Sequence, residues 1–166
     1  FKEIGVQIRH YLSIKTYISL ITGALVWLLL IILKVDYAIL WALITFLLNY
    51  IPNIGSFIAA IPIILFALIQ QGMEGMIWTA IGFLAIQMVM GNIVEPKVMG
   101  KGLGLSTLVV FISLIVWGFI LGPAGMFLSV PLTITLKIIL EQNEKTKWIA
   151  VVLGTEKETK QMLNEL

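Results

Sequence analysis

Two long stretches of this chain, residues 38–73 and residues 102–136, contain no charged side chain. About 20 apolar residues are enough for an α-helix to cross the hydrocarbon core of a bilayer, so each stretch is nearly twice as long as one crossing requires. Pro and Gly residues interrupt each stretch near its middle, at 52–55 and at 122–125. Paired helices joined by such a break inside the membrane are typical of transporters. The pattern therefore predicts an integral membrane protein that takes part in transport.

The overall composition also indicates a lipid environment. Of the 166 residues, 60% are hydrophobic and 12% are charged, whereas about 25% are charged in a typical soluble domain. The net charge of +2 is too small to indicate binding to nucleic acid. The chain has no cysteine and one histidine, and it lacks the phosphate-binding and metal-binding motifs of common enzymes. We therefore expect a membrane protein rather than an enzyme, with no catalytic residue, metal or cofactor.

The expected fold is all-α: a polytopic helical membrane protein with a transmembrane domain over residues 1–140 and a charged cytoplasmic tail over residues 141–166. Residues 1–13 are amphipathic and predict a separate helix at the membrane surface. Asp36 is expected to cap the helix that follows it. The predicted spans, with the two halves of each broken unit, cover residues 16–34, 37–50 with 56–70, 75–94, and 105–121 with 125–140.

The positions of lysine and arginine set the expected orientation, because these residues favour the cytoplasmic side of a membrane. They gather in the N-terminal segment, in the loop at 95–102 and in the C-terminal tail. All three regions can be cytoplasmic only if each broken unit returns to the side on which it begins, as a re-entrant hairpin or as two short spans. A span followed by a broken unit occurs twice, and the two spans would run in opposite directions. This is the pattern of an inverted repeat, with chance similarity between apolar segments as the alternative.

The two breaks hold the first group of candidate site residues. Proline removes a backbone donor and glycine tolerates a positive φ, so a break frees backbone groups that only protein or water can satisfy at membrane depth. The side chain of Asn49 adds polar groups beside the first break. The alternative is that both breaks are simple turns between packed helices. The candidates for a solute path or helix break are Asn49, Pro52, Asn53, Gly55, Pro62, Gly122, Pro123, Gly125 and Pro131.

The loop at 95–102 holds the second group. Glu95 is the carboxylate expected at a membrane edge facing protein, where an ionisable group is costly and often functional. Lys97 or Lys101 is expected to neutralise it, and an ordinary charge pair at the interface is the alternative. The candidates for a charged loop or gate are Asn92, Glu95, Pro96, Lys97, Gly100 and Lys101.

Three motifs carry a resemblance to a known family. They are NYIPNIG at 49–55, NIVEPKVMGKGLGLS at 92–106 and GPAGM at 122–126, of which E-P-K-x-M-G is the most specific. In this order they resemble the autoinducer-2 exporter family of bacterial permease-like membrane proteins. The resemblance implies that the chain corresponds to the C-terminal half of a longer protein and that it forms homo-oligomers. It also implies export of autoinducer-2, although some members are described as sodium(lithium)/proton antiporters.

Three hypotheses for function follow. The first is a multi-pass transporter of the bacterial cytoplasmic membrane that exports a small polar signal molecule used in quorum sensing, with the lipid bilayer and the solute as partners. The second is an antiporter for a monovalent cation and a proton, in which Glu95 is the only well-placed carrier in this chain. The third is a membrane scaffold without transport activity, in which small residues serve helix packing.

Overall fold

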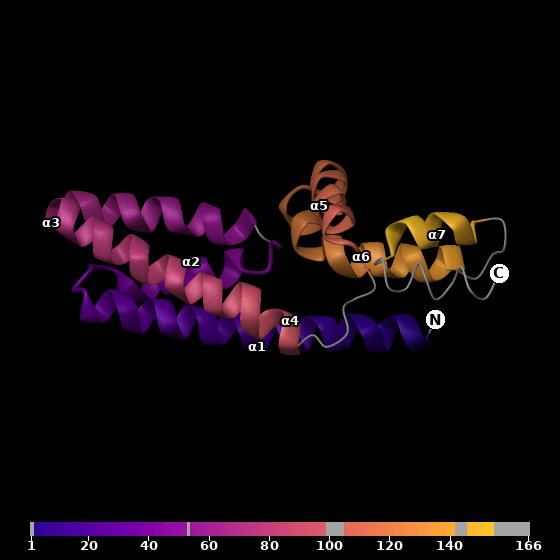
Figure 1. Cartoon of the computed structure of the whole chain (residues 1–166), viewed down its shortest axis with the longest axis horizontal. Helices are drawn as coiled ribbons and strands as arrows, with labels where there is room; N and C mark the ends of the chain where they lie inside the picture. Colours follow the sequence, from indigo (N-terminus) through magenta and orange to yellow (C-terminus); the bar gives the residue numbers. More distant parts are fainter. Residues whose placement is uncertain (1, 53, 99–104, 142–145, 155–166) are drawn as a thin grey trace. The chain divides into compact units, whose positions relative to one another are not determined.

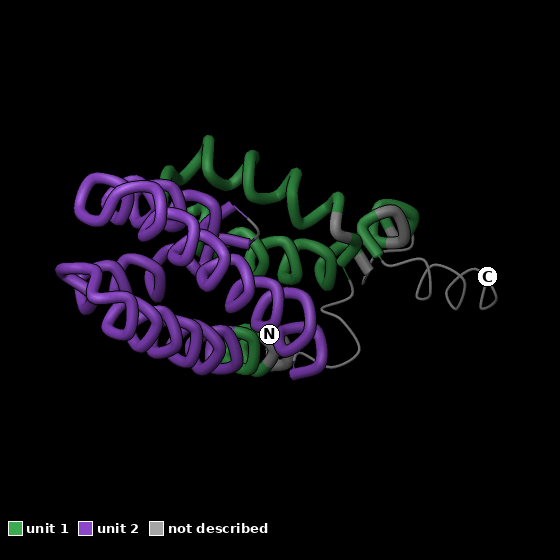
Figure 2. The backbone as a smooth tube through the Cα atoms, turned by 60° about the vertical axis from the view of Figure 1, so that its left-hand side comes forward, with its two compact units in different colours: residues 1–11, 99–166 green, residues 12–98 purple. Residues whose placement is uncertain are grey.

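The computed structural model describes residues 2–52, 54–98, 105–141 and 146–154. These residues form helices joined by short turns, and none of them belongs to a β-strand. Three helical stretches are long and apolar enough to cross a membrane: Ile8–Ile32, Ile54–Val98 and Pro123–Leu140. The prediction of an all-α polytopic membrane protein is therefore confirmed. The chain divides into two compact units, unit 2 over residues 12–98 and unit 1 over residues 1–11 and 99–166 (Figure 2).

The first helix, α1, is continuous over Lys2–Ile32. The sequence predicted a surface helix over 1–13 that is separate from the first span. The separation is wrong, because the structure joins the two segments in one helix. Residues 6–22 contain neither glycine nor proline, so nothing in this part of the chain interrupts the backbone hydrogen bonds. The body of α1 from residue 12 onward belongs to unit 2.

The helix α2, Ala38–Leu48, begins after a tight loop in which Lys34 and Tyr37 have positive φ angles of 56° and 58°. The prediction that Asp36 caps this helix is wrong. Tyr37 occupies the cap position without a side-chain hydrogen bond, and the backbone N–H of Asp36 donates to Gln70 Oε1 at 2.9 Å. A backbone N–H of the loop is therefore satisfied by a side chain from a distant part of the chain.

The helix α3, Ile54–Val89, bends sharply at Gly72, whose φ of 75° and ψ of −161° are not helical. Figure 1 shows α3 turning back on itself at this bend. The side chain of Gln71, next to the bend, donates to the carbonyl oxygen of Leu33 at 2.8 Å. The two ends of the broken segment 37–70 therefore lie together, which is the arrangement that a re-entrant hairpin or a pair of short spans requires.

Beyond α3 the helical path continues through a π-helical turn, η1, over Met90–Val94 and a last α-helical turn, α4, over Glu95–Val98. The sequence predicted that a loop begins at residue 95. The structure instead keeps residues 95–98 helical, and residues 99–104 lie outside the described part of the chain.

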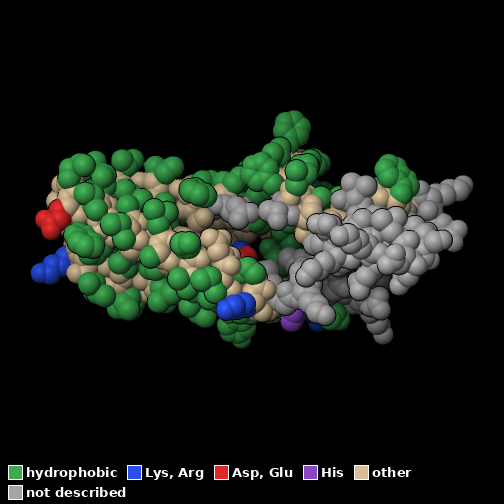
Figure 3. Space-filling view, viewed as in Figure 1, with side chains coloured by type: hydrophobic (Ala, Val, Ile, Leu, Met, Phe, Trp, Pro, Cys, Tyr) green, Lys and Arg blue, Asp and Glu red, His purple; other side chains and the backbone are tan. Residues whose placement is uncertain are grey.

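The core of unit 2 is apolar at the end that holds the α1–α2 loop. The side chains that form it are Val26, Leu30, Val35, Ala59, Ala60, Ile63, Ala67 and Phe83. Gly23 lets α1 approach α2 closely, because an added Cβ atom would lie 3.2 Å from the carbonyl oxygen of Ala42. Figure 3 shows hydrophobic side chains over the visible flank of this unit and charged ones at its loop end. Such a surface suits lipid rather than water.

Unit 1 is built on a hairpin of α5, Thr107–Leu121, and α6, Pro123–Glu141. The turn is made by Gly122, with φ 63°, and Pro123 begins the next helix, where its missing N–H has no helical acceptor to lose. Trp117 Nε1 donates to Thr133 Oγ1 at 3.0 Å across the hairpin. A short helix, α7, Lys147–Leu153, packs on α6.

Candidate functional site

The first helix break is a compact turn whose backbone donors are largely used. The N–H groups of Tyr50, Ile51, Ile54 and Gly55 all donate to carbonyl oxygens within residues 47–52. The sequence argument expected the break to leave backbone groups free for a solute. For the described residues, the amides are instead satisfied by the turn itself, and Asn53 lies outside the described residues. These four backbone N–H groups are therefore not free to donate to a solute.

The side chain of Asn49 ties the break to α1. Its Nδ2 atom donates to Ser19 Oγ at 3.0 Å, and both residues are buried. The neighbouring Tyr50 hydroxyl lies 2.7 Å from Thr16 Oγ1. Two consecutive residues at the end of α2 thus make side-chain hydrogen bonds to residues of α1 that the sequence did not single out.

Glu95 forms an ion pair with Lys15. The Lys15 Nζ and Glu95 Oε1 atoms are 2.5 Å apart, and the two side chains are 3% and 23% exposed. The sequence predicted Lys97 or Lys101 as the neutralising residue. Lys97 is exposed, and Lys101 lies outside the described residues. The counter-charge instead comes from α1, 80 residues away in the chain.

These contacts converge on one face of α1. Lys15 and Ser19 are four residues apart and therefore share a face of the helix. Asn49 and Glu95, which the sequence assigned to two different groups, therefore contact neighbouring positions on the same face of α1. We call Lys15, Ser19, Asn49 and Glu95 the polar junction.

The charge balance of the polar junction decides what it can do. A buried ion pair gains little net stability, because desolvation offsets the Coulomb attraction, but removal of one partner leaves an uncompensated charge. Hydroxyl and amide groups beside such a pair can donate to or accept from a polar solute. The junction is thus a set of polar groups suited to a small hydrogen-bonding ligand.

Three further polar atoms of unit 2 are buried and lack a hydrogen-bond partner among the described residues. They are Trp41 Nε1, Thr79 Oγ1 and Gln87 Nε2. An unpaired buried polar group costs about 1–3 kcal/mol. The interior of unit 2 therefore holds more hydrogen-bonding capacity than its own described residues use.

The remaining candidates are more scattered. Asn92 and Pro96 are exposed, and Pro62 lies within α3. The second-break residues Gly122, Pro123 and Gly125 form the turn between α5 and α6 in unit 1, and Pro131 lies within α6. Gly100, like Lys101 and Asn53, lies outside the described residues.

The sequence did not single out Lys15 and Ser19. The signal that would have identified them is their helical spacing with Thr22, which is also buried.

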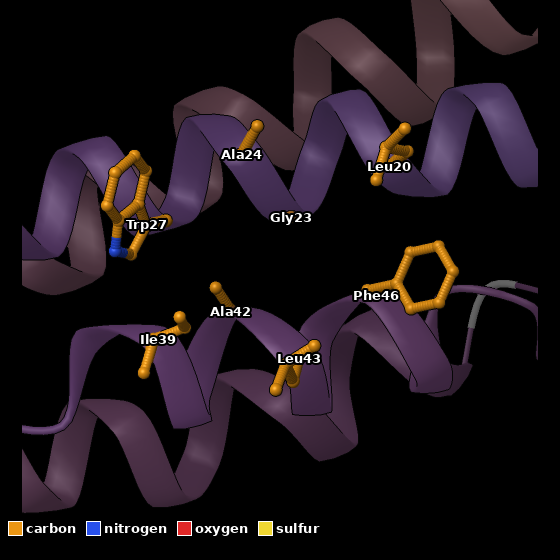
Figure 4. A pocket seen from close by; sticks show the side chains of 8 residues that line it. All are labelled: Leu20, Gly23, Ala24, Trp27, Ile39, Ala42, Leu43 and Phe46. Carbon is orange, nitrogen blue, oxygen red and sulfur yellow. The ribbon is translucent and has the colours of Figure 1, made fainter.

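An apolar groove on unit 2 lies apart from the polar junction. It has a volume of ≈ 230 Å³ and runs between α1 and α2, as Figure 4 shows. Its lining residues are Leu20, Gly23, Ala24, Trp27, Ile39, Ala42, Leu43 and Phe46. Because this lining is almost wholly apolar, the groove does not suit a polar solute.

Over the part of the chain that the structure describes, no three His, Asp or Glu side chains gather as a metal site would require.

Comparison with known proteins gives one consistent result. Residues 1–145 match the family described as AI-2E family transporter. The chain is 56% identical over 148 residues to the AI-2 transport protein TqsA of Escherichia coli K12, which covers 89% of this chain and 43% of that protein. It is 60% identical over 144 residues to a Haemophilus influenzae protein named as a transport protein. That match covers 87% of this chain and 41% of the other protein. The chain thus spans less than half the length of these relatives.

Proposed function

Because the chain belongs to the AI-2E family of transporters, we propose that it forms part of a bacterial exporter of a small polar signal molecule such as autoinducer-2. Its apolar helices and its relatives make it a multi-pass protein of the bacterial inner membrane. The name of the TqsA relative supplies the solute in this proposal. The polar junction supplies the site.

The depth of the polar junction supports this role. Exposed charged residues, Lys34, Asp36 and Glu74, lie around the α1–α2 loop and the bend in α3, and such residues mark a membrane surface. From Tyr37 to Asn49 is twelve residues, or about 18 Å of α-helix, against about 30 Å for the hydrocarbon core. In the proposed exporter, Asn49 and its partner Ser19 then lie inside the core.

One observation carries the proposal: beside a helix break, a buried amide bonds to a buried hydroxyl of α1, and one turn away on α1 the buried Lys15 pairs with the partly buried Glu95. Polar and ionisable residues are rare inside a membrane and mark the paths of solutes and ions. In the proposed exporter, the solute exchanges hydrogen bonds with Asn49 and Ser19 as it passes the break. The Lys15–Glu95 ion pair makes up the rest of the polar junction.

The test is efflux of labelled autoinducer-2 from cells or sealed vesicles that contain the whole transporter. Asn49→Leu and Ser19→Ala remove the polar groups, and we expect a large loss of efflux with normal amounts of protein in the membrane. Thr45→Val is the matched control, because the buried Thr45 hydroxyl donates to the carbonyl oxygen of Trp41 in its own helix. Efflux that is unchanged in Asn49→Leu and Ser19→Ala would remove the polar junction from the path.

The same vesicles separate this proposal from the other two hypotheses. An antiporter needs a carboxylate that exchanges a proton for a cation. The carboxylate of Glu95 is already paired with the buried Lys15. Sodium-driven proton movement without export of the signal molecule would favour the antiporter. Absence of both fluxes from a well-folded protein would favour the scaffold.

A further inference from the structure

A π-helical turn, η1, precedes Glu95 directly. The backbone N–H of Glu95 donates to the carbonyl oxygen of Met90, five residues earlier. In an uninterrupted α-helix that donor would be Val94, four residues after Met90. A single π turn inside an α-helical path is rare and is found frequently at functional sites. Here it gives Glu95 the place, relative to Met90, that Val94 would otherwise take.

This displacement determines which side chain meets Lys15. Met90 is buried at 5% exposure, and the residue one turn later shares its face of the helix. With η1 in place, that residue is Glu95, and its carboxylate reaches the ammonium group of Lys15. In the α register Val94 would lie on this face, and Glu95 would point about 100° further around the helix. Lys15 would then lose its counter-charge.

Pro96 provides the physical reason for the π turn. In an α-helix the ring of a proline collides with the carbonyl group four residues earlier, which here belongs to Asn92. Asn92 lies within η1, so the turn widens where this collision would occur. Glu95 also has helical angles, φ −56° and ψ −50°, although a following proline disfavours them. The backbone is therefore constrained around the residue that makes the ion pair.

We propose that Pro96 is a positioning residue, which holds η1 in the π register and so presents Glu95 rather than Val94 to Lys15. This inference concerns the geometry of the ion pair and holds independently of which solute is transported. It gives the dipeptide Glu95-Pro96 a division of roles: Glu95 contacts Lys15, and Pro96 acts through the backbone. Replacement of Pro96 by a residue with an N–H removes the reason for the π turn.

The test compares two cysteine pairs in the whole protein in its native membrane. Lys15→Cys is combined with Glu95→Cys or with Val94→Cys, and a bifunctional thiol reagent joins the pair. This chain has no cysteine of its own. With Pro96 present, we expect the 15–95 pair to give the higher yield. With Pro96→Ala, we expect the preference to reverse to 15–94.

A matched control and a rescue complete the design. Gly91→Ala also changes η1, but its added Cβ atom would meet no atom within 4 Å, so it should leave the preference for 15–95 intact. In Pro96→Ala, exchange of positions 94 and 95 (Val94→Glu with Glu95→Val) should restore the thermal stability that the single variant loses. A 15–94 preference with Pro96 present would overturn the proposal even if Pro96→Ala does not fold. A 15–95 preference that persists in Pro96→Ala would overturn it as well.

Discussion

The α carbon of Gly55 packs directly on the carbonyl group of Leu48, so closely that an added Cβ atom would lie 1.7 Å from the oxygen. Gly125 has the same relationship with Trp117, with a distance of 1.9 Å. Each glycine follows a helix break and contacts the end of the helix before it, seven residues back in one case and eight in the other. Both hairpins are closed by the same kind of contact. This likeness supports the prediction of an internal repeat.

Gly55→Ala and Gly125→Ala should both destabilise the protein. Because the nearest atoms in each case are the backbone carbonyl group of Leu48 or Trp117, which cannot rotate away, each added methyl group must push two helix ends apart. Overpacking of this kind costs about 1–3 kcal/mol and sometimes more. Thermal unfolding of the purified protein in detergent measures the loss. Gly5→Ala is the control, since its added methyl group would meet nothing within 4 Å, and a similar loss there would contradict the steric argument.

Lys15→Met should destabilise the protein more than the double replacement Lys15→Met with Glu95→Met. The single change leaves the Glu95 carboxylate without its partner, and breaking a buried pair in this way costs about 3–5 kcal/mol. The partial exposure of Glu95 places the expected value at the lower end. The double change removes both charges and should recover most of the stability. Equal stabilities of the single and double variants would show that the pair is not coupled.

Ser19→Ala and Asn49→Ala should show a measurable coupling in a double-mutant cycle. The Asn49 Nδ2 to Ser19 Oγ hydrogen bond is buried, and interhelical hydrogen bonds in membrane proteins contribute about 0.6 kcal/mol on average and up to about 1.7. Unfolding free energies of the four proteins give the coupling. Additive effects of the two replacements would mean that the hydrogen bond makes no net contribution, whatever its effect on transport.

Lys34→Gly should stabilise the α1–α2 loop. Lys34 has a φ of 56°, and the left-handed conformation costs a residue with a side chain roughly 1–2 kcal/mol relative to glycine. The greater freedom of glycine in the unfolded chain offsets part of this gain, so we expect a net increase below about 1 kcal/mol. Lys34→Ala keeps the positive φ and removes the charge. A rise in melting temperature for Lys34→Ala as large as that for Lys34→Gly would assign the effect to charge instead of backbone conformation.

The sequence was sufficient to predict the helical membrane fold and the main breaks in its helices. Proline and glycine act on the backbone locally, so the breaks at 52–55 and at 122–125, and the end of a helix at Gly72, are visible without tertiary information. Hydrophobicity is likewise a local property, and the charge-free stretches directly predict spans. These predictions depend on no contact between distant residues.

The polar junction was only half predictable, because its contacts cross long stretches of chain. Asn49 was recognisable as a polar residue beside a break and Glu95 as a carboxylate at a membrane edge, but Lys15 looked like an ordinary flanking lysine at the edge of a span. Its role depends on a contact with Glu95 across 80 residues. The expected partner Lys97 is closer in sequence, yet it lies exposed on a short helical turn. Asp36 illustrates the same limit, since it was expected to cap the helix that follows it, whereas its backbone N–H donates to the side chain of Gln70 in a distant part of the chain.

The bend at Gly72 differs from the two breaks in one respect that concerns movement. No atom lies within 4 Å of the place where its Cβ would be, so the positive φ of Gly72 turns the chain there without a glycine-dependent close contact. The first arm is fastened beside the bend by the amides of Gln70 and Gln71, while the far end of the hairpin is held to α1 by a few directional polar contacts. Rotation of the second arm about Gly72 would displace η1 and α4 the most, and with them the carboxylate that meets Lys15.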